Sequence, residues 1–199
     1  MPLLQEIELL GTTLWVWELL ESDYQIAESL NCISAIDGIH FKKRHDRLSF
    51  GWQFVLQSVL GQQYLGVYKD VQGKPFLLNS KLQLSVAHTR QIIVCALHQT
   101  KKIGVDIEAC SPKISRVKHK FMSTVELSTF DKEVDLTQVW CAKEAMFKLN
   151  GEHGISFKQD ILVKQISASS GEIFLRHHFA AQYASVLLGD LMIVIALEA

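Results

Sequence analysis

The sequence lacks the features that would mark a secreted, membrane-bound or zinc-binding protein. Its four cysteines, at positions 32, 95, 110 and 141, form no C-x-x-C pair and no regular spacing. That pattern argues against a disulfide framework or a zinc knuckle. No apolar run reaches the roughly 20 residues that a membrane-spanning helix needs, and the first residues carry no basic stretch typical of a secretory signal. We therefore expect a cytoplasmic protein with reduced thiols and no membrane association.

An excess of charge of one sign is also missing. The chain has 20 Lys and Arg against 21 Asp and Glu, a formal net charge of −1 at pH 7. Overall charge therefore gives no preference for nucleic acid or membrane. Basic residues gather locally in Lys42–Arg47 and Lys113–Lys120. Each cluster fits a solvated surface, a phosphorylated ligand or an acidic protein, but neither has the aromatic residues of a nucleic-acid-binding module, so we expect no nucleic-acid partner.

Several common enzyme motifs are absent, including the P-loop, G-x-S-x-G, H-E-x-x-H and G-x-G-x-x-G. The composition, with 48% hydrophobic and 21% charged residues among 199, is typical of a globular protein. A chain of this length forms one large domain or two small fused ones and buries roughly 70% of its unfolded surface.

Hydrophobic periodicity predicts both helices and strands. Two helices are expected, each ending at a glycine that stops it (Gly61 and Gly151), and the last third reads as three or four strands. The expected helices are Lys42–Leu60 and Gln138–Asn150, and the expected strands are Thr12–Leu20, Leu82–Val86, Ile92–Leu97 and those within Ile161–Ala199.

A weak internal repeat runs through the chain. Ile92–His98 resembles Met192–Glu198, and Ser85–Val86 matches Ser185–Val186 at the same offset. Chance similarity between apolar strands explains this equally well. A true repeat would mean two similar α+β halves joined near residues 99–102, packed tightly because no Pro/Gly-rich linker separates them.

Asp106 and Glu108 are the first candidate functional residues. On a strand, alternate side chains share a face, so these two carboxylates would lie together opposite Ile103, Val105 and Ile107. Adjacent carboxylates repel unless a cation lies between them, and oxygen ligands suit Mg²⁺. The spacing also fits the solvent face of an edge strand.

Glu144 and Lys148 are four residues apart on the second expected helix, with Trp140 one turn earlier. This spacing fits an ordinary stabilising ion pair as well as a catalytic pair. His88 and Lys74 are two further candidates for contact with phosphate, although single histidines are more often structural and turn lysines are usually solvated.

The order of these segments along the chain gives them a joint meaning. Gly73–Pro75 is followed by Ser85–Thr89, Gly104–Glu108, Phe121–Glu126 and Trp140–Lys148. This series, and above all the pairing of G-V-D-I-E with W-x-x-K-E-A-x-x-K, resembles the 4′-phosphopantetheinyl transferase family in its surfactin-synthetase-type branch. The resemblance covers about residues 40 to 160.

The resemblance implies a transferase that moves the phosphopantetheine arm of coenzyme A onto a serine of an acyl or peptidyl carrier protein and releases 3′,5′-ADP. It also implies a monomeric pseudo-dimer of two α+β halves, each a small antiparallel sheet with a long helix. The halves would be residues 1–100 and 101–199, with the active site between them. The sequence does not indicate which carrier protein is served.

The resemblance also implies roles for individual residues. Asp106, Glu108 and Glu144 would hold Mg²⁺ against the pyrophosphate of CoA, and Glu144 is the expected base for the acceptor serine. Lys74 and His88 would contact the 3′-phosphate.

Further CoA contacts follow from the same resemblance. Lys148 would lie beside the pyrophosphate and stabilise the leaving phosphate, and Thr89 would keep a hydroxyl beside His88. The alignment is looser at Lys43, Arg47 and Ser49, which fall where the family has additional phosphate contacts.

The chain departs from the family at Ala87, where a small polar residue is usual, and at Gln53, where many members have arginine. Both changes are expected to affect CoA contacts and to leave the carboxylates intact. Two other functions remain open: a metal-dependent phosphohydrolase using the same carboxylates, and a carrier-binding module without activity.

Overall fold

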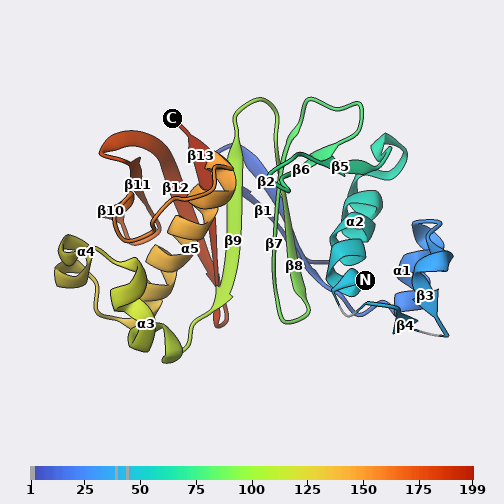
Figure 1. Cartoon of the computed structure of the whole chain (residues 1–199), viewed down its shortest axis with the longest axis horizontal. Coiled ribbons are helices and arrows are strands. Elements are labelled where there is room, and N and C mark those ends of the chain that lie inside the picture. The colour runs from blue at the N-terminus through green and yellow to red at the C-terminus, as the bar shows by residue number, and fades with distance from the viewer. Residues whose placement is uncertain (1–2, 39, 44) are drawn as a thin grey trace.

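A computed structural model describes residues 3–38, 40–43 and 45–199 of the chain (Figure 1). It is a mixed α/β structure whose described strands all pair antiparallel, as the resemblance implies. None of the helices in these ranges is long and apolar enough to cross a membrane.

The first sheet has four strands in the order β1-β2-β8-β7. Their bounds are β1 Leu3–Leu9, β2 Thr12–Glu18, β7 Gln83–Thr89 and β8 Ile92–His98. Helix α2 (Asp46–Leu60) covers one face of this sheet, because Trp52, Val55 and Leu56 of the helix pack with the buried strand residues Ile93 and Cys95.

The second sheet has five strands in the order β10-β11-β12-β13-β9. Their bounds are β9 Ile103–Ala109, β10 Ile161–Ser167, β11 Ser170–Leu175, β12 His178–Leu188 and β13 Leu191–Glu198. Helix α5 (Glu133–Asn150) packs on one face of this sheet through Leu136, Val139, Ala142 and Met146. The four C-terminal strands confirm the expectation for the last third of the chain.

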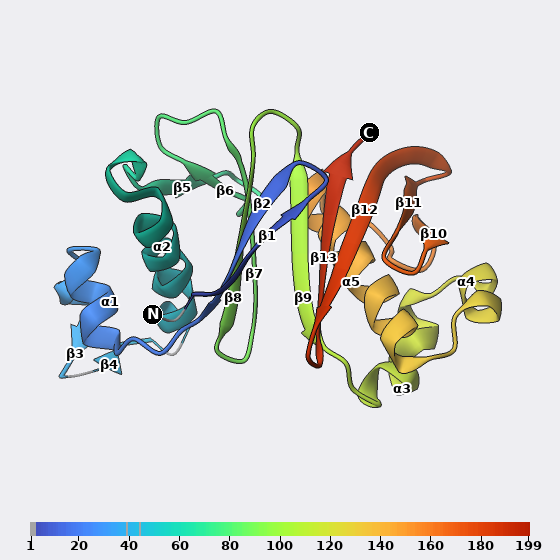
Figure 2. The same cartoon turned by 180° about the vertical axis from the view of Figure 1, so that it is seen from behind.

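The uncovered faces of the two sheets pack against each other. Val16 and Val94 of the first sheet share a buried apolar layer with Val105, Ile193 and Ile195 of the second. From behind, the β1-β2 hairpin and the β12-β13 hairpin lie toward the viewer, between the two long helices (Figure 2). Strands β7 and β9 lie side by side where the sheets meet. The result is a helix–sheet–sheet–helix arrangement without a flexible linker.

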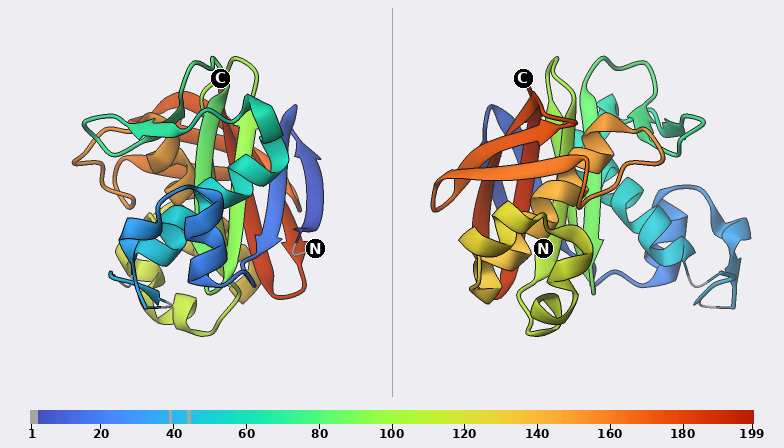
Figure 3. Two further views of the ribbon diagram at one scale, coloured as in Figure 1. Left: turned by 90° about the vertical axis from the view of Figure 1, so that its right-hand side faces the viewer. Right: turned by 60° about the vertical axis from the view of Figure 1, so that its left-hand side comes forward.

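Short elements complete the chain (Figure 3). Two hairpins, three short α-helices and two 3₁₀ helices connect the main elements of the described chain. The hairpins are β3 Ile36–Asp37 with β4 His40–Phe41 and β5 Val67–Lys69 with β6 Pro75–Leu77. The helices are α1 Asp23–Ser29, α3 Lys113–Phe121, α4 Thr124–Thr129, η1 Ile33–Ala35 and η2 Gly61–Gln63. Helix α1 and the β3-β4 hairpin lie beyond α2, whereas α3 and α4 lie beside α5.

The ends of both long helices are as expected, but their starts are not. Gly61 and Gly151 follow the last helical residues with φ of 55° and 74°, a conformation that favours glycine. Helix α2 begins at Asp46 rather than at residue 42, because Lys42 and Lys43 form turn hydrogen bonds with Ala35 and Asp46. Helix α5 begins at Glu133, five residues before the expected start, because its acidic first turn suits a helix N-terminus.

Candidate active site

Strand β9 presents Asp106 and Glu108 to helix α5. The alternate residues Ile103, Val105 and Ile107 are at most 1% exposed and face the layer between the sheets, as predicted. Although β9 is an edge strand, Asp106 is only 7% exposed and Glu108 is half-buried. The alternative of a solvent-facing edge is therefore wrong.

Gly104 allows the helix to come this close to the strand. A Cβ atom at this position would lie 1.9 Å from the carbonyl oxygen of Ala145 and 2.8 Å from the amide nitrogen of Leu149. Both atoms belong to the backbone of α5 and have no rotamer that would avoid the clash. The absence of a side chain at residue 104 thus sets the distance between the carboxylates of β9 and the side chains of α5.

Lys148 joins the helix to the strand. Its Nζ donates to Asp106 Oδ1 at 2.8 Å and to the carbonyl oxygen of Val105 at 2.9 Å. Lys148 forms no ion pair with Glu144, so the expected stabilising pair along the helix is absent. The other carboxylate oxygen, Asp106 Oδ2, is buried and has no hydrogen-bond partner among the residues that the structure describes.

The three carboxylates influence one another. Burial raises the pKa of Glu108, the charge of Asp106 raises it further, and a hydrogen bond from Trp140 opposes this rise. Burial also raises the pKa of Glu144. The charges of Asp106 and Glu108 raise this pKa further, whereas the charge of Lys148 lowers it. Asp106, Glu108 and Glu144 therefore share one negatively charged region.

A hard divalent cation suits this donor set. The unpartnered Asp106 Oδ2 and the repulsion among the carboxylates are what a cation would relieve. As the side chains stand, no three Asp, Glu, His or Cys groups in the described part of the chain converge into a metal centre. The metal-binding roles of Asp106, Glu108 and Glu144 therefore stay a prediction.

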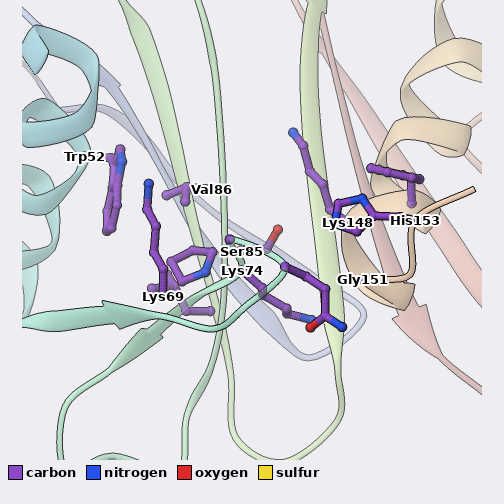
Figure 4. A pocket seen from close by; sticks show the side chains of 13 residues that line it. Trp52, Lys69, Lys74, Ser85, Val86, Lys148, Gly151 and His153 are labelled. Carbon is purple, nitrogen blue, oxygen red and sulfur yellow. The ribbon is translucent and has the colours of Figure 1, made fainter. Parts of the chain in front are cut away.

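A cleft of about 260 Å³ lies beside this region (Figure 4). The β5-β6 hairpin contributes Lys69 and Lys74, strand β7 contributes Ser85, and the end of α5 contributes Lys148 with His153 beyond it. Two of the sequence candidates, Lys74 and Lys148, thus line the same cleft, and its cationic side chains suit a phosphorylated ligand.

The turn of the hairpin places Lys74 in the cleft. Asp70 Oδ1 accepts hydrogen bonds from the amides of Gln72 and Lys74 at 3.0 and 2.8 Å, and Gly73 has a φ of +85°. Lys74 Nζ then reaches across to the carbonyl oxygen of Leu149 at 3.2 Å. Burial and the nearby Lys102 lower the pKa of Lys74 against the opposing effect of Asp70.

Strand β7 connects the cleft to the carboxylates. Ser85, which is 4% exposed, accepts a hydrogen bond from the amide of Val105 at 2.9 Å, next to Asp106. His88 lies exposed further along the strand. Partial desolvation and the Lys148 ammonium lower the pKa of His88, whereas Asp106 acts in the opposite direction. His88 is therefore within electrostatic reach of both.

Five predicted CoA contacts lie outside the residues that line the cleft, namely His88, Lys43, Arg47, Ser49 and Thr89. The Arg47 guanidinium pairs with Asp23 and donates to the carbonyl oxygens of Leu19 and Glu21 at 3.2 and 3.0 Å. Arg47 thus anchors the start of α2 to the segment before α1. The remainder of the basic cluster includes Arg44, which lies outside the described residues.

Glu144 lines a second hollow, of about 480 Å³. Phe121 and Phe157 form its aromatic walls, and their ring centroids lie 5.0 and 5.6 Å from that of Trp140. Lys120 at its rim adds a cation. We call this hollow the aromatic groove; through Glu144 it borders the carboxylate region.

The sequence pattern did not single out several residues of the site. Trp52, Lys69 and His153 line the cleft, and the buried thiol of Cys141 lies near Asp106. Lys69 and Lys74 lie on either side of one hairpin turn. The candidate Lys74 could therefore have indicated Lys69 as a second residue of the cleft. Trp52, His153 and Cys141 lie at the site only because of how the two sheets and their helices pack, which no local pattern indicates.

Comparisons with known proteins agree with this geometry. A sequence profile described as the 4′-phosphopantetheinyl transferase superfamily matches residues 102–196, which include the three carboxylates and Lys148. The 4′-phosphopantetheinyl transferase HetI of Nostoc sp. strain PCC 7120 is 28% identical over 141 residues, which is 61% of this chain and 58% of that protein. The chain thus matches less than two thirds of the length of this relative. By both matches, the chain is similar to proteins of the 4′-phosphopantetheinyl transferase superfamily.

Proposed function

We propose that the protein transfers the 4′-phosphopantetheine arm of coenzyme A to a serine of an apo acyl or peptidyl carrier protein and releases 3′,5′-ADP. The observation that carries this proposal is the shared cleft of Lys74 and Lys148 beside Asp106. CoA carries a 3′-phosphate and a pyrophosphate on its nucleotide. The first could bind to Lys74 and the second to Lys148. Similarity to the superfamily supports the reaction type.

The pairing of Lys148 with Asp106 suggests how charge is managed during the reaction. In the transfer, the acceptor serine oxygen forms a bond to the β-phosphorus while the bond to the bridging oxygen breaks, and that electron pair leaves with 3′,5′-ADP. Lys148 would stabilise the negative charge on the leaving phosphate. Lys74 and His88 would hold the distant 3′-phosphate, so that the reacting end is oriented.

Glu144 is the proposed base. Its position between the carboxylate region and the aromatic groove lets it face an incoming acceptor. Its raised pKa favours acceptance of the serine proton. Bound by Asp106, Glu108 and Glu144, Mg²⁺ would offset the charge of the pyrophosphate oxygens.

Two similar halves provide the frame for this site in our proposal, residues 1–100 and 101–199, with the protein acting as a cytoplasmic monomer. The strand order β2-β8-β7 with α2 corresponds to β9-β13-β12 with α5. In this correspondence the echo of Ile92–His98 in Met192–Glu198 relates β8 to β13. Ser85 on β7 likewise relates to Ser185 on β12.

The basic helix α3 is the proposed contact for an acidic carrier protein. Its Lys113–Lys120 segment borders the aromatic groove through Lys120. Charge reversal at Arg116 and Lys118 should raise the KM for the carrier and leave the affinity for CoA unchanged. An unchanged carrier KM would remove this contact from the proposal.

The deciding experiment incubates the protein with CoA, Mg²⁺ and a panel of apo carrier proteins. Transfer should add about 340 Da to a carrier, the mass of the arm, and EDTA should prevent it. No mass change on any carrier would refute the proposal. Release of phosphopantetheine without an acceptor would instead favour the phosphohydrolase, and tight carrier binding without transfer would favour the inactive module.

A further inference from the structure

Lys143 lies next to Glu144 on α5 but points away from the cleft into the protein. It is 0% exposed, and its ammonium contacts four oxygens from four different positions of the chain. These are Glu126 Oε2 at 2.8 Å and the carbonyl oxygens of Phe121, Phe157 and Ile161 at 2.9, 2.8 and 2.6 Å. No other lysine in the described part of the chain is as buried.

Glu126 completes the pair from the opposite side. It is 1% exposed, and its Oε2 also accepts the amide hydrogen of Ser123 at 2.7 Å, while Oε1 accepts that of Val163 at 2.9 Å. Strand β10 is the edge of its sheet, and its outward groups Ile161 C=O and Val163 N–H need partners. Lys143 and Glu126 satisfy both, in the place where a neighbouring strand would lie.

The segments held in this way form the walls of the aromatic groove. The carbonyl oxygens of Phe121 and Phe157 bind the Lys143 ammonium, and the rings of the same two residues face Trp140. Glu144, one residue further along α5, lines the same groove. One buried cation therefore fixes both walls relative to the helix that carries the proposed base.

A purely stabilising role does not require an ion pair. Buried pairs are often replaced by apolar residues without loss of stability. No apolar side chain, however, can bind three carbonyl groups and two amides that belong to separate segments. The arrangement is specific to holding these segments in one relative position.

We propose that the Lys143–Glu126 pair is a positioning pair that sets the shape of the aromatic groove for the acceptor protein, without a part in CoA binding. This inference rests on the proposed transfer function, since the acceptor is the substrate that must approach Glu144. The residues that line the CoA cleft include none of those bound by Lys143.

The test compares Lys143→Met with a matched control on the same helix, Gln138→Ala. Gln138 is 2% exposed and donates to Ser185 Oγ at 2.6 Å and to the Ala168 carbonyl oxygen at 3.0 Å, away from the groove. Steady-state transfer should show a carrier KM raised at least about tenfold for Lys143→Met, with a calorimetric Kd for CoA within about twofold of wild type. Gln138→Ala should change neither.

Two further measurements keep the inference testable if Lys143→Met is unstable or if no carrier is modified. The double variant Lys143→Met/Glu126→Gln removes the ammonium without leaving a buried unpaired carboxylate, and it should show the same raised carrier KM. Hydrogen exchange of the Ser123 and Val163 amides should accelerate in Lys143→Met and in the double variant. The exchange rate of these amides should be unchanged in Gln138→Ala.

The results also separate failure of this inference from failure of the proposed function. Absence of transfer by the wild-type protein would refute the proposed transferase function. Hydrogen exchange of the Ser123 and Val163 amides would still test whether the Lys143–Glu126 pair holds these segments. Unchanged exchange at these amides, an unchanged carrier KM in a folded variant, or an equal loss of CoA affinity would each overturn the positioning role.

Discussion

Replacing Gly104 with alanine tests whether the close contact of β9 with α5 creates the site. The new Cβ would lie 1.9 Å from the carbonyl oxygen of Ala145, where an ordinary contact needs at least 3.4 Å. The neighbouring carbonyl carbon and the Leu149 amide nitrogen, both at 2.8 Å, are also backbone atoms. The clash is relieved only if the helix moves away from the strand.

The size of that movement determines two effects. Overpacking a core costs about 1–3 kcal/mol, and a backbone clash should fall at the upper end or above. For a chain of this size, about 3 kcal/mol corresponds to a melting temperature lowered by roughly 6–12 °C. The movement also breaks the 2.8 and 2.9 Å contacts of Lys148 with β9. A misplacement of about 1 Å can cost roughly 100-fold in rate, so transfer by folded protein should fall at least that far.

Gly171→Ala is the matched control. A Cβ at residue 171 would lie 2.2 Å from the Lys164 carbonyl oxygen and 2.5 Å from the Tyr183 ring, in the same sheet but outside the cleft. Differential scanning calorimetry should show a comparable loss of stability in both variants, while single-turnover transfer by folded protein falls only in Gly104→Ala. A Gly104→Ala protein with the wild-type melting temperature, or with normal transfer, would refute the reasoning.

Three further predictions concern individual side chains. Glu144→Gln and Asp106→Ala should each lower the single-turnover rate at least about 100-fold, because a base or a metal ligand is lost; near-normal rates in both would contradict these roles. Ser85→Ala leaves the buried Val105 amide without its acceptor and should lower the free energy of unfolding in urea by about 1–3 kcal/mol, so a loss below about 0.5 kcal/mol would argue against this contact. Because the pKa of His88 is lowered, the side chain gains a proton only at a pH below the ordinary histidine pKa. The calorimetric affinity for CoA should therefore rise on acidification in wild type relative to His88→Gln, and identical pH profiles would exclude the 3′-phosphate contact.

Local patterns predicted the parts of the site that belong to single elements. The alternation along Ile103–Glu108 places both carboxylates on one face, and the glycine at position 151 ends α5 shortly after Lys148. These outcomes depend on strand geometry and on the conformational freedom of glycine, which are properties of a few neighbouring residues.

Contacts between distant segments were not predictable in this way. Arg47 belongs to a basic cluster by sequence, yet its guanidinium pairs with Asp23, and the spacing of Glu144 and Lys148 suggests an ion pair that Asp106 replaces. Lys143 belongs to the W-x-x-K-E-A-x-x-K motif, but the motif does not indicate its four oxygen partners, which all come from other segments. In each case the partner is selected by tertiary packing, which no spacing along the chain records.

The peptide group of Val105 shows why the site needs both sheets. Its N–H is held by Ser85 of the first sheet, and its C=O is held by Lys148 of α5, which packs on the second. The orientation of the adjacent Asp106 carboxylate is thus determined from both sides. Lys74 and Ser85 lie outside residues 102–196, the region that matches the superfamily profile. The matched region therefore contains the proposed chemistry, whereas Lys74, the proposed 3′-phosphate contact, and Ser85, which accepts from the Val105 amide, precede it.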